Sequence, residues 1–294
     1  MDRVHGEGRQ GDDGTLYVVA TPIGNVEDIT LRALKVLAAA DVIAAEDTRN
    51  TASLLKRHGI GKRPVALHQH NEASMAAKVV QWLRQGRSVA LVTDAGTPGL
   101  SDPGALVVAR AMTAGLRVVP IPGANAAVAA FSASGLTDAR FLFYGFLPAR
   151  SSARRAAIAA LASLNCALVF YEAPHRILDS VDDLAAVLPG ERTIVIAREL
   201  TKVFESIASL PLHGAPAWMR ADANRQRGEF VLIVAGAPEK DQKSRTGWEA
   251  TLEHLLGELP LAQAVRLTCT LTGARRKAVY GHALAVAAMA DTKD

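Results

Sequence analysis

The first half of the chain alternates short apolar runs with stretches of helical periodicity, and this alternation constrains the fold more than any other feature. A strand followed by an amphipathic helix is the repeating unit of a parallel sheet covered by helices. The pattern predicts strands at 16–20, 42–45, 65–67, 88–93 and 117–121, with helices around 31–37 and at 48–58, 72–85 and 103–114. We therefore expect an open α/β domain over residues 15–122.

After Pro122 and Gly123 the alternation begins again and predicts a second α/β domain over residues 123–238. Its expected strands are 141–146, 167–171, 193–197 and 230–235, and its expected helices are 125–134, 151–164, 175–187 and 216–226. Residues 239–247 are polar and charged and are interpreted as a linker, and residues 248–294 as a small helical module. The glycine-rich residues 1–14 lack the apolar core of a signal peptide and are interpreted as a disordered tail.

The composition is ordinary for a globular protein and excludes several other classes. With 294 residues, 49% of them hydrophobic and 21% charged, the chain is not a disordered tail, a collagen or a coiled coil. The uncharged run 118–137 is as long as a membrane span, but prolines and glycines interrupt it, so we expect no transmembrane segment. Cys166 and Cys269 form no metal-ligand spacing and no disulfide framework, which indicates a reducing, cytoplasmic location.

Positive charge is concentrated in two segments. The net charge is only 33 − 29 = +4, but residues 49–93 hold eight Lys or Arg against one acid, and residues 139–171 hold four Arg and no acid. Such local excess suits a polyanion such as RNA, because phosphate neutralisation contributes much of the affinity for nucleic acids. Solvated helix faces explain the same charges equally well, so charge alone leaves both interpretations open.

Residues typical of ligand-binding turns follow four of the predicted strands. These segments are 20–25, 46–49, 94–104 and 120–125. Open α/β sheets place their ligands at the carboxyl ends of the strands, and Gly, Pro and Asp there let a ligand approach the backbone closely. Four such loops at one edge of one sheet predict a binding site.

Two segments of the second domain couple a carboxylate to cations directly after apolar runs. They read Phe170-Tyr-Glu-Ala-Pro-His-Arg176 and Ala197-Arg-Glu-Leu-Thr-Lys202. A structural ion pair explains each of them, but strand ends in a second domain would also let that domain close over the first, and clefts between domains hold small-molecule cofactors. His68 and His70 lack a third ligand at a recognised spacing, so we predict no metal site.

Five segments carry a family resemblance. They read Leu16-Tyr-Val-Val-Ala-Thr-Pro-Ile-Gly-Asn25, Ala44-Ala-Glu-Asp-Thr-Arg49, Thr93-Asp-Ala-Gly-Thr-Pro-Gly-Leu-Ser-Asp-Pro-Gly104, Phe170-Tyr-Glu-Ala-Pro-His-Arg176 and Arg198-Glu-Leu-Thr-Lys202. In this order, over residues 16–236, they resemble the ribosomal RNA branch of the tetrapyrrole (precorrin) methylase superfamily. The closing helical segment resembles the C-terminal helical domain of that branch.

The resemblance implies a fold, an activity and partners. The fold would be α/β, with two domains of the tetrapyrrole methylase type (class III S-adenosylmethionine methyltransferase) and a small C-terminal helical module. The activity would be S-adenosylmethionine-dependent 2′-O-methylation of a cytidine ribose in small-subunit (16S) ribosomal RNA. The partners would be 16S rRNA or the small ribosomal subunit, and a second copy of the chain, since superfamily members are commonly dimers. Two alternatives stay open: methylation of a tetrapyrrole carbon, and RNA binding without catalysis.

Candidate site residues follow from the resemblance and from the basic segments. The implied cofactor contacts are Pro22, Gly96, Thr97, Leu100, Asn125, Ala126, Glu172 and Leu200, although Ser is more usual at the positions of Asn125 and Ala173. The candidates for handling the proton of the ribose hydroxyl are Asp47, Glu172, Glu199 and Lys202. An ion pair that holds a closing loop explains Glu199 and Lys202 equally well. The residues expected to contact RNA phosphates are Arg150, Arg154, Arg155, Arg275, Arg276 and Lys277.

Overall fold

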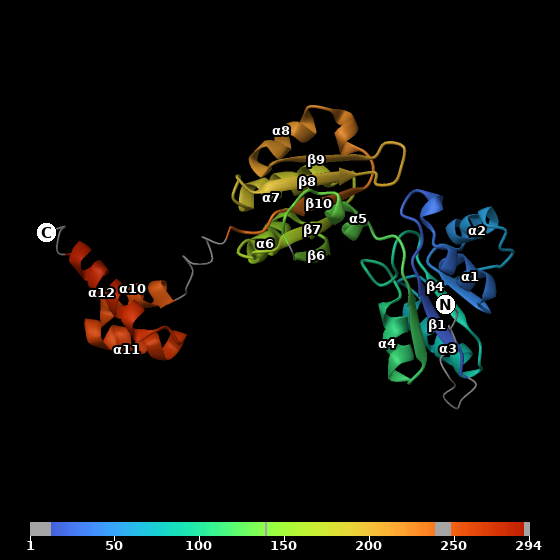
Figure 1. Ribbon diagram of the computed structural model, residues 1–294, viewed down its shortest axis with the longest axis horizontal. Coiled ribbons are helices and arrows are strands. Elements are labelled where there is room, and N and C mark those ends of the chain that lie inside the picture. Colours follow the sequence, from blue (N-terminus) through green and yellow to red (C-terminus); the bar gives the residue numbers. More distant parts are fainter. Residues whose placement is uncertain (1–12, 139, 239–247, 291–294) are drawn as a thin grey trace, which may run out of the picture. The chain divides into compact units, whose positions relative to one another are not determined.

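The computed structural model describes residues 13–138, 140–238 and 248–290 (Figure 1). The chain divides into two compact units. The first contains the residues up to Ala160 together with Ala167–Ala235, and the second contains Leu161–Cys166 and the residues from Gly236 onward. The predicted linker, and the predicted tail apart from its last two residues, lie outside the described residues. The predicted domain boundaries stay predictions.

The first sheet has five parallel strands in the order β3-β2-β4-β1-β5. The strands are β1 (Thr15–Val19), β2 (Val42–Ala45), β3 (Val65–Ala66), β4 (Val89–Val92) and β5 (Arg117–Ile121). Every residue of β2 and β4 is buried, because the helices that cross between parallel strands cover both faces of the sheet. The carboxyl ends of all five strands therefore meet at one edge.

Four helices cover this sheet, two on each face. They are α1 (Leu31–Ala39), α2 (Thr48–Arg57), α3 (Glu72–Arg84) and α4 (Ala105–Thr113). Leu37 of α1 and Leu55 of α2 share one apolar cluster, whereas Val79 of α3 and Val107 of α4 share the other. The helix predicted to begin at Pro103 begins at Ala105, because the Glu72 carboxylate accepts hydrogen bonds from the backbone N–H groups at 104 and 106, at 2.8 and 3.0 Å.

The second sheet is mixed, with the order β6-β7-β10-β8-β9. Its strands are β6 (Phe141–Phe146), β7 (Ala167–Glu172), β8 (Thr193–Arg198), β9 (Ser206–Pro211) and β10 (Phe230–Val234). Only β6 and β7 are parallel, and the other neighbours are antiparallel. The strand β9 was not predicted: it forms one edge of the sheet, and its residues are exposed or half-buried.

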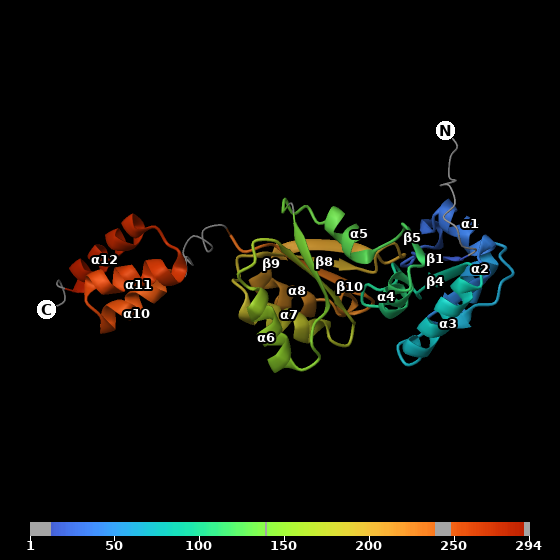
Figure 2. The same cartoon turned by 90° about the horizontal axis from the view of Figure 1, so that it is seen from below.

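Four helices lie against the second sheet. They are α5 (Ala126–Ser132), α6 (Ser151–Leu161), α7 (Ile177–Val187) and α8 (Ala215–Arg220). Figure 2 shows α5 on one side of the sheet and the other three on the opposite side. Ala127 and Ala130 of α5 pack on the strands through Val169 and Ile233, where small side chains let the helix approach closely.

The described part of the second unit contains three helices, α10 (Trp248–Glu258), α11 (Leu261–Thr272) and α12 (Arg276–Ala290). Leu252, Val265 and Val279, one from each helix, form the centre of its small core. Gly273, with a φ of 70°, ends α11 in the left-handed conformation and turns the chain toward α12. None of the described helices is long and apolar enough to cross a membrane. The predicted fold class, two α/β parts followed by a helical region, is confirmed.

Candidate active site

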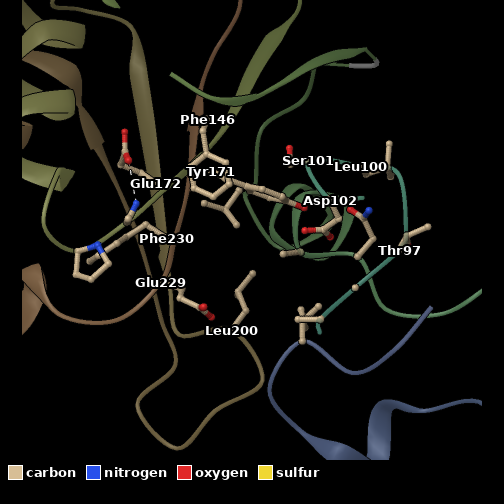
Figure 3. A pocket seen from close by; sticks show the side chains of 18 residues that line it. Thr97, Leu100, Ser101, Asp102, Phe146, Tyr171, Glu172, Leu200, Glu229 and Phe230 are labelled. Carbon is tan, nitrogen blue, oxygen red and sulfur yellow. Dashed lines mark hydrogen bonds between the residues drawn. The ribbon is translucent and has the colours of Figure 1, made fainter. Parts of the chain in front are cut away.

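A cavity of about 290 Å³ lies in the first unit, between the carboxyl-end loops of the first sheet and the strands of the second (Figure 3). The lining residues from the first side are Ile23, Ala95, Gly96, Thr97, Leu100, Ser101, Asp102, Asn125 and Ala126. Those from the second side are Phe146, Tyr171, Glu172, Ala173, Pro174, Leu200, Glu229, Phe230 and Val231. Of the eight predicted cofactor contacts, seven line this cavity, and the eighth, Pro22, is the neighbour of Ile23.

Backbone pairing joins the loops after β1 and β4. The N–H of Thr21 donates to the carbonyl of Gly96 at 2.9 Å, and the N–H of Gly96 donates back at 3.0 Å. The Thr21 hydroxyl also donates to the carbonyl of Thr93 at 3.0 Å. These bonds hold the start of the β4 loop against the β1 loop, so this wall of the cavity is formed in advance of any ligand.

The start of α5 connects the two sheets. The side chain of Asn125 accepts a hydrogen bond from the N–H of Val128 at 3.0 Å and so caps this helix. The N–H of Ala127 donates to the Tyr171 hydroxyl of β7 at 3.2 Å. The ring of Tyr171 meets that of Phe146 with centroids 5.8 Å apart, which makes this side of the cavity aromatic.

A strained loop, residues 199–205, brings Leu200 to the cavity. Glu199 and Thr201 have φ values of 53° and 65°, a region that favours glycine. The Thr201 hydroxyl accepts a hydrogen bond from the N–H of Asn25 at 2.9 Å. A Cβ atom on Gly24 would lie 2.6 Å from Cγ of Lys202, so only glycine fits there. This loop therefore contacts the β1 loop directly.

Lys202 is held by two carboxylates. Its Nζ donates to Glu199 and to Glu229, both at 2.8 Å. Burial alone would lower the pKa of Lys202, but these hydrogen bonds outweigh it and raise the pKa. Burial alone would raise the pKa of Glu199, but the hydrogen bond from Lys202 and smaller effects outweigh burial, so the pKa is lowered. This geometry fits the ion-pair interpretation of Glu199 and Lys202, and neither side chain lines the cavity.

Glu172 lies at the cavity, but its carboxylate is engaged elsewhere. The residue is 2% exposed, and its oxygens accept hydrogen bonds from the Ser180 hydroxyl at 2.5 Å and from the N–H of Ala173 at 2.9 Å. Arg176 adds an ion pair at 3.4 Å. In Figure 3 the carboxylate points away from the side chains across the cavity. Glu172 thus fixes the turn that follows β7.

Asp47 caps α2 at the edge of the first sheet and does not line the cavity. Its carboxylate accepts a hydrogen bond from the N–H of Arg49 at 2.8 Å and pairs with the Arg49 guanidinium at 2.6 Å. The side-chain hydrogen bond from Arg49 is the main reason that the pKa of Asp47 is lowered to about 2. A carboxylate with so low a pKa is a poor proton acceptor.

Sequence reasoning missed Asp102, the acidic residue of the β4 loop that lines the cavity. Burial is the main reason that its pKa is raised to about 6, and the negative charges of Glu46 and Asp94 add to this rise. The Thr93 hydroxyl opposes part of it. The pattern offered one clue, a second acid eight residues after Asp94 in the same glycine-rich segment, but turn-forming acids are common.

The structure corrects one of the predicted RNA contacts. Arg154 is 3% exposed, and its Nε donates to Asp183 at 2.7 Å, so it cannot reach a phosphate. We remove it from the RNA-binding residues, because an arginine placed in the interior needs its carboxylate partner. Arg155 also pairs with Asp183, but its side chain is 54% exposed. Arg150, Arg275, Arg276 and Lys277 are exposed.

Comparisons with known proteins identify two families in the chain. The family "Tetrapyrrole (Corrin/Porphyrin) Methylases" matches residues 15–216, and "RsmI C-terminal HTH domain" matches residues 246–287. The "Ribosomal RNA small subunit methyltransferase I" of Pseudomonas aeruginosa is 48% identical over 273 residues, which are 92% of this chain and 97% of that protein.

Solved structures share the fold at low sequence identity. The methyltransferase CobJ has a TM-score of 0.58 and 21% identity, covering 76% of this chain and 95% of that chain. A uroporphyrin-III C-methyltransferase of Thermus thermophilus, solved with S-adenosylhomocysteine, has a TM-score of 0.54 and 17% identity. The match covers 76% of this chain and 97% of that chain. From the two family matches and the 48% identity, the chain belongs to the tetrapyrrole methylase family, in its ribosomal RNA small subunit methyltransferase I branch.

Proposed function

We propose that the protein transfers the methyl group of S-adenosylmethionine to the ribose 2′-hydroxyl of a cytidine in 16S ribosomal RNA. One observation carries this proposal: seven residues that the family resemblance assigns to the cofactor come from four separate segments of the chain and line one cavity. The relative from Pseudomonas aeruginosa, named for methylation of small-subunit ribosomal RNA, supports the substrate.

The cavity suits such a methyl donor. Pockets for small molecules are mostly apolar with a few polar groups, and their volumes begin at about 300 Å³. Phe146, Tyr171 and Leu200 supply apolar surface for an adenine, and the turns around Gly96 and Asn125 place backbone polar groups beside it. When bound, S-adenosylmethionine supplies an activated methyl group on a positively charged sulfur, for which the Asp102 carboxylate provides a favourable negative charge.

In this proposal none of the four predicted catalytic residues reacts with the substrate directly. Lys202 and Glu199 hold the loop that presents Leu200, and Glu172 holds the turn after β7. Asp47 fixes the start of α2 and takes no part in the transfer. Glu172, Glu199 and Lys202 are positioning residues, because their polar groups are bound to other protein groups.

RNA contacts are proposed for the exposed basic residues only. These are Arg150, Arg155, Arg275, Arg276 and Lys277. Arg276 and Lys277 begin α12, and Arg275 directly precedes it. Phosphate contacts of this kind position a nucleic acid without reading its sequence. A homodimer, which the resemblance implies, and a cytoplasmic location, which the cysteine content indicates, are also part of this proposal, and sedimentation of the purified chain would test the dimer.

The experiment is transfer of labelled methyl groups to small ribosomal subunits that lack the modification, followed by mapping of the labelled nucleoside. We expect label on the ribose of one cytidine. Naked 16S rRNA as acceptor distinguishes the free RNA from the assembled subunit. Label on a tetrapyrrole precursor alone would replace the proposed substrate, and binding of S-adenosylhomocysteine without any transfer would indicate an RNA-binding protein that lacks catalysis.

A further inference from the structure

Three carboxylates line the described part of the cavity, and two of them are neutralised by protein partners. Glu172 is bound by Ser180 and Arg176. Glu229 pairs with Lys202 at 2.8 Å, and its side chain is 76% exposed. The third, Asp102, forms no ion pair with any residue that the structure describes, and the charged groups that shift its pKa are the acids Glu46 and Asp94. It is therefore the cavity carboxylate that is left to interact with a ligand.

Acidic neighbours surround Asp102 from the adjacent elements. Glu46 follows β2 and Asp94 follows β4, and both raise the pKa of Asp102 by their negative charge. Burial also raises the pKa of Glu46. From the second sheet, Tyr171 extends toward Asp102 in Figure 3, and the Asp102 charge contributes to the raised pKa of this tyrosine. Burial and the charges of Glu46 and Asp94 make the Asp102 carboxylate more basic than an ordinary one, and with a pKa of about 6 it is still mostly ionised at neutral pH.

The backbone around Asp102 is fixed from two sides. Ser101, the residue before it, has a φ of 67°, which is strained for a residue other than glycine. Gly145, at the irregularity in β6, faces Ser101 so closely that a Cβ atom would lie 2.7 Å from the serine Oγ. On the other side, Glu72 binds the N–H of Gly104. A strained residue held between two such contacts is typical of a functional loop.

We propose that Asp102 is the base that accepts the proton of the ribose 2′-hydroxyl during methyl transfer, an inference that rests on the function proposed above. The hydroxyl oxygen forms a bond to the methyl carbon, and the bond from that carbon to sulfur breaks with its electron pair left on sulfur. The hydroxyl proton passes to an Asp102 oxygen and from there to water. Atoms and charge balance, with the methyl donor as the sole co-reactant.

A base is most effective when its pKa lies close to the working pH, and general-base catalysis typically contributes about 10² to 10⁴ in rate. Asp47, with a pKa of about 2, is far from this optimum, whereas Asp102, at about 6, is close to it. The position at the cavity and the basicity thus favour the same residue.

The test is the full-length Asp102→Asn variant, which keeps the shape of the side chain and removes its proton affinity. Single-turnover methyl transfer to unmodified small subunits at pH 7.5 should fall at least about 100-fold. Affinity for S-adenosylhomocysteine, measured by calorimetry, should stay within about threefold, because the proton acceptor is needed only in the chemical step.

The pH profile separates a base from a structural residue. The wild-type rate should fall as the pH drops below about 6, because Asp102 becomes protonated, and the residual rate of Asp102→Asn should lack this decline. The matched control is Glu46→Gln, which removes a neighbouring negative charge outside the cavity. In this variant the decline of the rate should shift to lower pH, because the pKa of Asp102 is then raised less.

Stability gives a readout that is independent of activity. Because the folded state raises the pKa of Asp102, the ionised form is disfavoured by folding, and stability is lost as the pH rises through about 6. Asp102→Asn should therefore melt at a higher temperature than wild type at pH 7.5, and the gain should shrink toward pH 4. A lower melting temperature at pH 7.5 would indicate a structural role and would contradict the proposal.

The outcomes separate this inference from the function on which it rests. If the wild-type protein transfers no methyl group to the subunits, the proposed function fails, whatever Asp102→Asn does. If wild type is active and Asp102→Asn is equally fast with the same pH profile, only the assignment of the base is overturned.

Discussion

Arg154 and Arg155 are neighbours in the sequence, but the fold gives them different environments. Both bind Asp183, at 2.7 and 2.5 Å. Arg154 is almost completely buried and also donates to the carbonyl of Ala149 at 3.1 Å, whereas the side chain of Arg155 is more than half exposed. The Ser151 hydroxyl completes the donors around Asp183. The same residue type therefore serves the fold at one position and is open to solvent at the next.

We expect Arg154→Ala to lower the free energy of unfolding by about 3–5 kcal/mol, because it removes the buried partner of a buried carboxylate. Arg155→Ala should lower it by at most about 1 kcal/mol, since an exposed ion pair is screened by water. Urea denaturation measures both. For binding to small subunits the order should reverse, with Arg155→Ala weakening affinity and reducing its salt dependence. Equal destabilisation by the two variants would contradict the assignment.

At this scale the sequence predicted residue positions better than residue roles. The family resemblance implied cofactor contacts at Gly96, Thr97 and Leu100, in a loop that follows a predicted strand, and these residues line the cavity. What a charged side chain does depends on its partners, which come from distant segments. Ser180 engages Glu172, and Glu229 engages Lys202. Asp102 was missed for the same reason, because its basicity arises from burial and from Glu46, 56 positions earlier in the chain.

Among the elements, β6 and the loop after β4 depend on each other. The strand pairs with β7, and its register shifts between Phe143 and Gly145. Gly145 has a φ of 82° and faces Ser101 of the loop. The irregularity in an edge strand of the second sheet thus makes room for a loop of the first sheet, and this contact shapes the cavity.

Gly145→Ala should lower both stability and cofactor affinity. The left-handed backbone alone costs about 1 kcal/mol for alanine, and the contact with Ser101 at 2.7 Å adds a displacement of the loop that carries Leu100 and Asp102. The matched control is Gly115→Ala, where φ is 75° and no atom lies within 4 Å of the new Cβ. Both variants should lose stability in urea denaturation, but only Gly145→Ala should weaken binding of S-adenosylhomocysteine in calorimetry. Equal cofactor affinity in the two variants would contradict the role of this contact.

Elements with continuous apolar runs were predictable, and elements at edges were not. The ranges of β2, β5 and β6 match the predicted ones to the residue. By contrast, β9 pairs along one side only and leaves Ile207 38% exposed, so its apolar pattern is weak. The helix predicted at 216–226 ends at Arg220, because Asp222 accepts a hydrogen bond from the N–H of Asn224 and starts a separate 3₁₀ turn.

On the scale of the whole molecule, each compact unit contains its own apolar core. The first unit has clusters on both faces of the first sheet and under α5 on the second. The second unit has a core around Leu252, Val265 and Val279. All residues that line the cavity belong to the first unit. Under the proposed function, methyl-donor binding lies in the first unit, and the proposed phosphate contacts of Arg275, Arg276 and Lys277 lie in the second.

A chain that ends after Pro238 tests this division. It should fold, because the clusters of the first unit are complete without α10, α11 and α12, and the bond from the N–H of Ala237 to the carbonyl of Leu164 is retained. S-adenosylhomocysteine should bind with unchanged affinity. Binding to small ribosomal subunits should weaken at least about tenfold, which corresponds to about 1.4 kcal/mol.

The matched control keeps the helical module and removes its charge, through Arg275→Ala, Arg276→Ala and Lys277→Ala in the full-length chain. If these side chains contact three phosphates, the slope of log affinity against log salt should decrease in magnitude by about 2–3 in the truncated chain and in the triple variant. The reason is that fewer counterions are released on binding when phosphate contacts are lost. Circular dichroism should show that the triple variant keeps the helices. A truncated chain that binds subunits as tightly as the full chain would contradict the proposed RNA contacts of α12, because phosphate affinity would then reside in the first unit, on residues such as Arg150 and Arg155.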